Sequence, residues 1–265
     1  MDISGNVLVI TGAGNGIGRQ VTLQLLAQGA SVAGVDLNEA GLTETARLAN
    51  VGNRFSAHVV NITDRDAVEA LPSTIASAFG RIDALVNIAG VIQKFVKVND
   101  LPFSEIEKVM NVNFWGTMNM VKAFLPALLA RPAAALVNVS SMGAYAPVPG
   151  QAVYGASKAA VKILTEALYA ELLDTNVAVT VVFPGAIGTD IATNSGVSLG
   201  DASADAPAYK TTLPEEAARV IVEAIKKGKF RATIGRDAAA MDRLARLSPK
   251  TATTVIAKQM GALLS

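Results

Sequence analysis

The sequence predicts a single α/β domain built on a doubly wound parallel sheet of about seven strands. Short β-branched and apolar runs alternate with amphipathic helical segments along nearly the whole chain, and this alternation is typical of strand–helix–strand units. The chain has 265 residues, of which 51% are hydrophobic, enough for one domain with a large core. It contains no internal repeat and no linker that would separate a second domain.

The first unit predicted from the N-terminus is a strand, a glycine-rich turn and a helix. The β-branched run Val7–Ile10 reads as a strand buried on both faces. It leads directly into Thr11–Gly18, and a helix is expected over Arg19–Gln28. In this context a glycine loop binds a dinucleotide, because its backbone approaches the pyrophosphate closely and the helix N-terminus faces it. An ordinary surface loop is the alternative.

The second predicted strand, Ser31–Asp36, ends in a carboxylate. Asp36 lies at about the distance beyond the glycine turn at which an acid accepts hydrogen bonds from the adenosine ribose. An acid there also repels a 2′-phosphate, and Leu37, Asn38 and Asn15 offer no positive charge. The pattern therefore favours NAD over NADP, although Asp36 could also be an ordinary turn or capping acid.

The other elements follow from the same alternation. We expect strands over 54–60, 84–87, 134–139, 177–183 and 230–234, and helices over 39–49, 66–79, 104–129 and 214–227. Residues 190–210 are predicted to form a mobile substrate loop, because small and polar residues dominate there. The extension 238–265 is expected to form two helices divided by Pro249. Their apolar residues would cover either a substrate pocket or a subunit interface.

The strongest chemical signal is Tyr154 with Lys158. Small and apolar residues continue from this stretch at helical spacing, so the two side chains lie on one helix face. A nearby ammonium lowers the pKa of a phenol, which suits Tyr154 for proton exchange with an alcohol near neutral pH. A decrease of ~3 units needs roughly 4 kcal/mol, so a second positive charge, such as an oxidised nicotinamide ring, would help. An amphipathic helix face without chemistry is the alternative.

Composition excludes several other classes. The net charge is +1, which leaves no global basic footprint for nucleic acid. The chain has no cysteine and one histidine, His58, so thiolate and multi-histidine metal sites are excluded and no metal is expected. His58 lies within a predicted strand and is interpreted as structural. We see neither a signal peptide nor an apolar run of the ~20 residues that span a bilayer, and expect a cytoplasmic protein.

Several ordered motifs together resemble those of the short-chain dehydrogenase/reductases, in their compact single-domain branch. The resemblance covers about residues 5 to 235. The matching segments are Thr11-Gly12-x-x-x-Gly16-x-Gly18, Asn87-Ile88-Ala89-Gly90, Asn113, Ser141 thirteen residues before Tyr154, Lys158, and Pro184-Gly185-x-Ile187-x-Thr189. The resemblance implies a Rossmann-type fold and an oxidoreductase.

The resemblance also implies four catalytic roles. Tyr154 would be the acid/base for the alcohol proton, and Ser141 would hold the substrate oxygen. Lys158 would bind the nicotinamide ribose and lower the pKa of Tyr154. Asn113 would bend its helix and position a water that relays the proton. Spacing alone would instead allow Asn113 simply to face solvent.

The implied NAD site extends along the carboxyl ends of the strands. The expected cofactor residues are Gly12, Asn15, Gly16, Ile17, Gly18, Asp36, Leu37, Asn61, Ile62, Asn87, Ala89, Gly90, Tyr154, Lys158, Pro184, Gly185, Ile187 and Thr189. One position departs from the family, which commonly has Asp where this chain has Asn61. An amide there can still accept a hydrogen bond from the adenine amino group.

The predicted substrate wall is mostly apolar, with two amides and no charge, and favours a neutral, hydrophobic alcohol or ketone. Its residues are Ile92, Gln93, Phe95, Ser141, Met142 and Gln151, with Ala144 and Val148 beside them. Family members usually assemble as homotetramers or homodimers, here through the helix after Tyr154 and the helix at 214–227. An NADP-linked ketoreductase is the main alternative, and a non-catalytic dinucleotide sensor is a remoter one.

Overall fold

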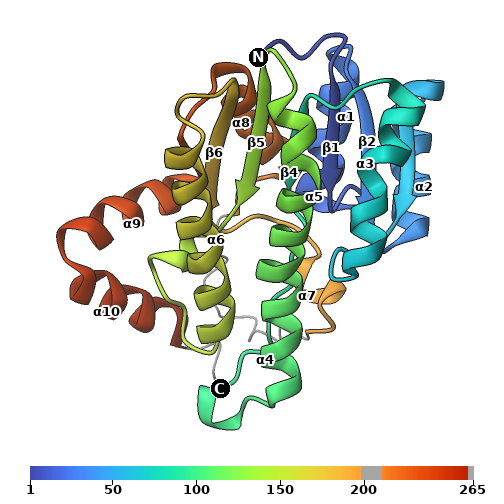
Figure 1. Ribbon diagram of the computed structural model, residues 1–265. Helices are drawn as coiled ribbons and strands as arrows, with labels where there is room; N and C mark the ends of the chain where they lie inside the picture. Colours follow the sequence, from blue (N-terminus) through green and yellow to red (C-terminus); the bar gives the residue numbers. More distant parts are fainter. Residues whose placement is uncertain (198–210, 262–265) are drawn as a thin grey trace.

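The computed structural model describes residues 1–197 and 211–261 as one domain around a seven-stranded sheet (Figure 1). All neighbouring strands are parallel, in the order β3-β2-β1-β4-β5-β6-β7. The strands are β1 (Val7–Thr11), β2 (Ser31–Asp36), β3 (Phe55–Val59), β4 (Ala84–Asn87), β5 (Ala134–Val139), β6 (Val177–Pro184) and β7 (Arg231–Ile234). The predicted doubly wound α/β fold is confirmed, and the strand order reverses between β1 and β4.

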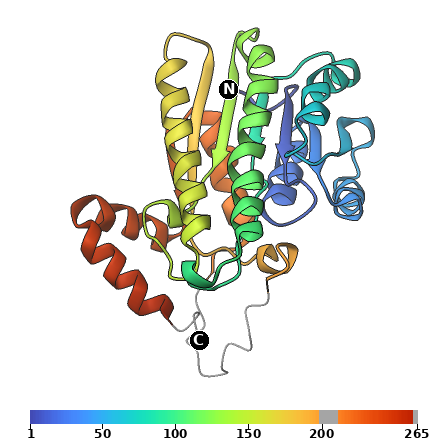
Figure 2. The same ribbon diagram turned by 60° about the horizontal axis from the view of Figure 1, so that its bottom comes forward.

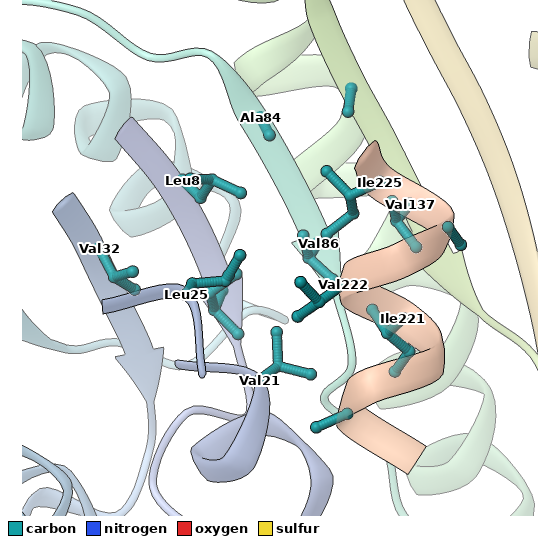
Figure 3. Packing of buried hydrophobic residues seen from close by; sticks show 14 of the residues in the cluster. Leu8, Val21, Leu25, Val32, Ala84, Val86, Val137, Ile221, Val222 and Ile225 are labelled. Carbon is teal, nitrogen blue, oxygen red and sulfur yellow. The ribbon is translucent and has the colours of Figure 1, made fainter. Parts of the chain in front are cut away.

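Helices cover both faces of the sheet. One face carries α1 (Gly16–Ala27), α2 (Glu39–Ala49) and α8 (Pro214–Lys227), and the other carries α3 (Arg65–Phe79), α5 (Thr117–Leu129) and α6 (Ala152–Glu171). Figure 3 shows the first layer, where Leu25 of α1 and Val222 of α8 pack against Leu8 and Val86 of the sheet. Burying one such side chain contributes about 1.5–3 kcal/mol.

The helix predicted over 104–129 is divided in three. α4 (Phe103–Met110) continues into a π-helical turn, Asn111–Gly116, before α5 begins. The amide of Asn113 lies inside this turn and is fully buried. A π-turn leaves carbonyl groups outside the usual α-helical ladder and is frequent at functional sites. Sequence periodicity does not reveal it because the apolar face continues through the turn.

The C-terminal extension forms two helices, as expected, and they project from the body of the domain (Figures 1 and 2). These are α9 (Arg236–Leu247) and α10 (Pro249–Met260), and Pro249 occupies the first turn of α10. Met241 and Ile256 pack on Tyr145 and Ala146, in the segment after Ser141. The extension thus contacts a predicted substrate segment. Residues 262–265 lie outside the described part of the chain.

Only part of the predicted mobile loop 190–210 falls within the described residues. It begins with the short helix α7 (Ile191–Asn194), and residues 198–210 lie outside the description. In the described ranges, no helix is long and apolar enough to span a bilayer.

A buried carboxylate ties the amino ends of two central strands together. Asp83, which precedes β4, is 1% exposed and accepts a 2.8 Å hydrogen bond from the Val7 amide. Its two oxygens also pair with the Nε atoms of Arg81 and Arg131, each at 2.8 Å. We therefore expect Asp83→Ala to lower the free energy of unfolding by about 3 kcal/mol, because both arginines and an amide lose their partner.

Equilibrium denaturant unfolding checks this expectation. The control is Glu44→Ala, which breaks the exposed Glu44–Arg47 pair and should cost less than about 1 kcal/mol. Equal losses in the two variants would contradict a special role for Asp83.

Candidate active site

Four side chains predicted to act together converge at the carboxyl edge of the sheet. Ser141 follows β5, Tyr154 and Lys158 lie in the first two turns of α6, and Asn113 lies in the π-turn. Lys158 and Asn113 both lie close to the backbone of Gly90, just beyond β4. A Cβ atom there would lie 3.0 Å from Lys158 Nζ and 3.1 Å from Asn113 Oδ1.

Ser141 and Tyr154 also approach each other. A Cβ atom on Gly143 would lie 3.4 Å from Ser141 Oγ and 3.5 Å from Tyr154 Cε1. The Ser141 hydroxyl lowers the pKa of the Tyr154 phenol through a side-chain hydrogen bond. It also accepts a bond from the Gly143 amide at 3.0 Å. Ser141 and Tyr154 therefore lie close together at the carboxyl edge of the sheet.

Asn113 locks three segments together. Its Oδ1 accepts from the Val91 amide at 2.8 Å, and its Nδ2 donates to the Val91 carbonyl at 2.9 Å. Nδ2 also donates to Ser157 Oγ at 2.9 Å, and Ser157 in turn donates to the Tyr154 carbonyl at 2.7 Å. Ser157 was missed by sequence reasoning. Its only signal was its place between Tyr154 and Lys158.

The pKa of Tyr154 is raised, mainly by burial, and the hydrogen bond from Ser141 partly lowers it. The direction is opposite to the one expected from the Tyr154–Lys158 pair. Desolvation penalises the phenolate, and the hydrogen bond with Ser141 only partly offsets that penalty. The protein alone therefore does not prepare the phenolate.

Lys158 is buried, and burial lowers its pKa to about 8. Its ammonium donates to the Val139 carbonyl at 3.1 Å. Ser140 Oγ donates to the Lys158 carbonyl at 2.7 Å and so fixes the helix backbone. An ammonium has three donors, so Lys158 retains the capacity to bind a further hydroxyl group.

A cleft of about 390 Å³ lies at the switch point between β1 and β4, where open α/β sheets bind ligands. Its lining includes twelve of the predicted cofactor residues: Gly12, Asn15, Gly16, Ile17, Gly18, Asp36, Leu37, Asn61, Ile62, Ala89, Gly90 and Thr189. Val35, Asn38, Val60, Ile88, Val91, Val112, Ile191 and Asn194 complete the lining and were not predicted. Most of these are apolar residues next to predicted ones, where only the folded chain shows which side chains face the cleft.

The remaining predicted cofactor residues lie outside this lining. They are Asn87, Tyr154, Lys158, Pro184, Gly185 and Ile187. Asn87 braces the sheet, because its Nδ2 donates to Asn138 Oδ1 at 2.9 Å. The 184–189 segment reaches the glycine turn through Thr189, whose Cγ2 would lie 3.3 Å from a Cβ atom on Gly16.

The glycine turn allows no side chain at two positions. Gly12 has a φ of +74°, and a Cβ atom there would lie 3.0 Å from the Ala89 amide nitrogen. A Cβ atom on Gly18 would clash with the Gly12 carbonyl oxygen. These close approaches explain why glycine is needed where α1 begins against the sheet.

Asp36 supports the wall of the cleft. Its Oδ2 accepts from the Gly14 amide and its Oδ1 from the Asn38 amide, at 2.8 and 2.9 Å. Each carboxylate oxygen can accept a second hydrogen bond. Arg19, which sequence reasoning missed, binds the carbonyls of Gly14 and Gly41 and so links the glycine turn to α2.

Asn61, the position that departs from the family, also lines the cleft. Its Oδ1 accepts bonds from the Thr63 amide and hydroxyl, at 3.0 and 2.9 Å. The carbonyl end of this amide is thus used locally, and the adenine contact stays a prediction.

The predicted substrate residues separate into two groups. Ile92 and Phe95 form an apolar cluster with Tyr154 and with Ala192 and Val197. Met142 and Val148 pack instead against the C-terminal helices. The amides of Gln93 and Gln151 are buried and donate to backbone carbonyls, Gly150 and Gln93 respectively. Direct contact of the two glutamines with a substrate stays a prediction.

This fold, with a cleft at its switch point and a Ser–Tyr–Lys cluster beside it, is that of an oxidoreductase that uses a nicotinamide dinucleotide. The family profile described as short chain dehydrogenase matches residues 6–198. The chain belongs to the short-chain dehydrogenase/reductase family, and the resemblance seen in its motifs is confirmed.

Three relatives show how close the likeness is. The putative oxidoreductase SadH of Mycobacterium tuberculosis is 39% identical, over 92% of this chain and 91% of SadH. A short chain dehydrogenase/reductase from Burkholderia phymatum, solved with NAD, has a TM-score of 0.84 at 26% identity, over 92% of this chain and 94% of its own. One from Burkholderia cenocepacia, solved with NADP, has a TM-score of 0.81 at 28% identity, over 97% and 99%.

The buried ammonium of Lys158 gives stability a specific pH dependence. Its pKa is about 8 in the folded protein and near 10.5 in the unfolded chain. Between these values the unfolded state binds more protons, so this group makes stability rise with pH. We expect Lys158→Met to stabilise the ligand-free protein, by about 2–3 kcal/mol more at pH 7 than at pH 10. Denaturant unfolding at both pH values measures this difference. Equal effects at the two pH values would contradict it.

Proposed function

We propose that this protein is an NAD-dependent oxidoreductase that interconverts a secondary alcohol and a ketone on a neutral, hydrophobic substrate. The observation that carries the proposal is the convergence of Ser141, Tyr154 and Lys158 beside the cleft at the β1–β4 switch point. A bound nicotinamide would supply the hydride chemistry. The protein supplies position, charge and a path for the proton.

Each side chain has a defined part in the proposal. Ser141 donates to the substrate oxygen, and Tyr154 takes the proton in oxidation and returns it in reduction. Lys158 binds the nicotinamide ribose through its free donors and adds positive charge near the phenol. Asn113 holds the π-turn and the Val91 backbone in place. A water relay beside Asn113 is part of the proposal.

The charge balance gives the oxidised cofactor a second role. Burial raises the pKa of Tyr154 in the protein alone. The positive charge of an oxidised nicotinamide ring would favour the phenolate. Proton removal by Tyr154 would therefore become efficient only with the oxidised dinucleotide in place.

Asp36 supports NAD as the cofactor. Its carboxylate lies at the wall of the cleft, where it could accept bonds from the ribose hydroxyls and would repel a 2′-phosphate. The neighbouring wall residues Leu37 and Asn38 carry no positive charge. The two solved relatives hold NAD in one case and NADP in the other, so the likeness alone does not choose between them.

The substrate class follows from the apolar cluster over Tyr154. Ile92, Ala192 and Val197 are buried beside the ring, and Phe95 and Ile191 pack against them. These five side chains bring no charge to the phenol, which suits a neutral, hydrophobic carbon skeleton. We also propose that the protein is cytoplasmic. The exposed Ile163 on α6 supports the further proposal that it assembles as a homodimer or homotetramer.

The first experiment is a panel of secondary alcohols assayed by nicotinamide absorbance, with NAD and NADP in parallel. Turnover of hydrophobic alcohols with NAD supports the proposal. Turnover with NADP alone would replace it by a ketoreductase, and dinucleotide binding without any turnover would favour a sensor.

The assigned role of Tyr154 leads to a direct test. We expect Tyr154→Phe to lower kcat by at least about 10³-fold, because the general acid/base is lost. NADH binding, followed by fluorescence, should change little. Tyr169→Phe is a matched control on the same helix, since Tyr169 is partly exposed and pairs with the Phe230 ring. Near-normal turnover in Tyr154→Phe would refute the acid/base role.

Cofactor choice can be tested at Asp36. Asp36→Ala should lower the preference for NAD over NADP at least about tenfold, because the repulsion of a 2′-phosphate is removed. Asp36→Asn separates charge from loop bracing, since its amide oxygen still accepts a backbone bond. The measurement is kcat/KM with each cofactor. An unchanged ratio in both variants would show that Asp36 does not select the cofactor.

A further inference from the structure

The helix that carries Tyr154 and Lys158 has no cap of its own. Gln151 occupies the N-cap position of α6, but its side chain makes no capping bond. By contrast, Asn38 caps α2 and Asp64 caps α3 through their own side chains. A helix leaves its first amide groups without intrahelical partners, so those of α6 need an acceptor from elsewhere in the fold.

Gln93 supplies that acceptor from the loop after β4. Its Oε1 accepts from the Val153 amide at 2.9 Å and from the Tyr154 amide at 3.0 Å. Its Nε2 donates to the Gly150 carbonyl at 2.8 Å. This pattern fixes the orientation of the amide, because only the oxygen can accept and only the nitrogen can donate. Gln93 is fully buried.

A second glutamine holds Gln93 in place. Gln151 Nε2 donates to the Gln93 carbonyl at 2.7 Å. The two residues therefore bind each other's segments: Gln93 caps α6, and Gln151, which precedes α6, holds the backbone of Gln93. Main chain and side chain of Gln93 are both committed to the start of α6.

The two residues before Gln93 bind other parts of the site. Val91 is held by Asn113 of the π-turn through its amide and carbonyl. The Ile92 amide donates to Ser195 Oγ, just after α7, at 3.0 Å. Three consecutive residues thus connect the π-turn, the segment beyond α7 and the catalytic helix. A displacement of the Gln93 side chain would also displace Tyr154, because the Tyr154 backbone amide donates to Gln93 Oε1.

We propose that Gln93 is a positioning residue for Tyr154, which it holds by capping α6 with a neutral amide. This inference rests on the proposed acid/base role of Tyr154. It also gives a physical reason for a neutral amide, rather than a carboxylate, at this position. A carboxylate at the same place would put a negative charge beside the Tyr154 backbone and disfavour the phenolate. A neutral cap leaves the positive helix N-terminus free to favour it.

Two substitutions test the proposal. Gln93→Met keeps the length of the side chain but removes all three hydrogen bonds. We expect kcat to fall about 10–100-fold while the KM for alcohol and the Kd for NADH change less than about threefold, because misplacement of a proton-transfer group acts on the chemical step. A rise in KM with unchanged kcat would overturn the proposal and make Gln93 a substrate contact.

Gln93→Glu keeps the acceptor for both amides and adds a charge. We expect it to raise the pKa of Tyr154 by about one unit or more. Ultraviolet difference titration of tyrosinate, with the oxidised dinucleotide bound and Tyr154→Phe as the blank, measures this without any substrate. An unmoved midpoint would overturn the proposal. The titration requires neither turnover nor correct folding of Gln93→Met. Failure of the proposed reaction would appear in the alcohol panel, whereas failure of the proposal for Gln93 would appear in the titration.

The matched control removes a helix cap elsewhere. Asp64 accepts from the Ala67 amide at 3.1 Å at the start of α3, on a helix that contributes nothing to the cleft lining. Asp64→Ala should lower stability by about as much as loss of a typical cap, but it should leave the Tyr154 midpoint unchanged. If Asp64→Ala moved that midpoint as far as Gln93→Glu does, the effect would be general loosening and the proposal would fail.

Discussion

The candidate site depends on one constraint, which is that the backbone of Val91 and Ile92, in the partly buried loop after β4, bonds to side chains rather than to the sheet or a helix. Buried amide and carbonyl groups without partners are costly. Here the side chains of Asn113 and Ser195 bond to the loop backbone. In turn, the side chain of Gln93 in this loop accepts a hydrogen bond from the backbone of α6. The hydrogen bonds of this loop therefore connect the π-turn, Ser195 at the end of α7 and the start of α6.

Burial of the site also makes the charged forms of its ionisable side chains unfavourable. Desolvation raises the pKa of Tyr154 and lowers that of Lys158 to about 8. The protein thus holds a phenol and an ammonium in an environment that favours their neutral forms. The apolar core on both faces of the sheet offsets this cost. In the proposed reaction, the positive charge of an oxidised nicotinamide would favour the phenolate, and the ribose hydroxyls would accept hydrogen bonds from the Lys158 ammonium.

The C-terminal extension contacts two segments next to the site. Tyr145 donates from its hydroxyl to the Ala238 carbonyl of α9 at 2.9 Å. Asp237, also in α9, accepts from the Ala186 amide at 2.8 Å, in the segment that follows β6. One helix therefore supports both the segment after Ser141 and the segment expected to contact the nicotinamide. These contacts place α9 beside a segment that the sequence predicts to line the substrate pocket.

The sequence by itself determined the order and class of the secondary structure, the glycine turn and which side chains to expect together at the candidate site. β2 and α2 lie within the bounds predicted for them, because hydrophobic period and turn residues are local signals. The tertiary structure decided the π-turn at Asn113, the capping of α6 by Gln93 and the direction of the Tyr154 pKa shift. Each depends on burial or on a partner far along the chain, as for Gln93 and Tyr154, which are 61 residues apart in sequence. No local pattern carries that information, because hydrogen bonds across the fold and desolvation arise only when distant segments pack together.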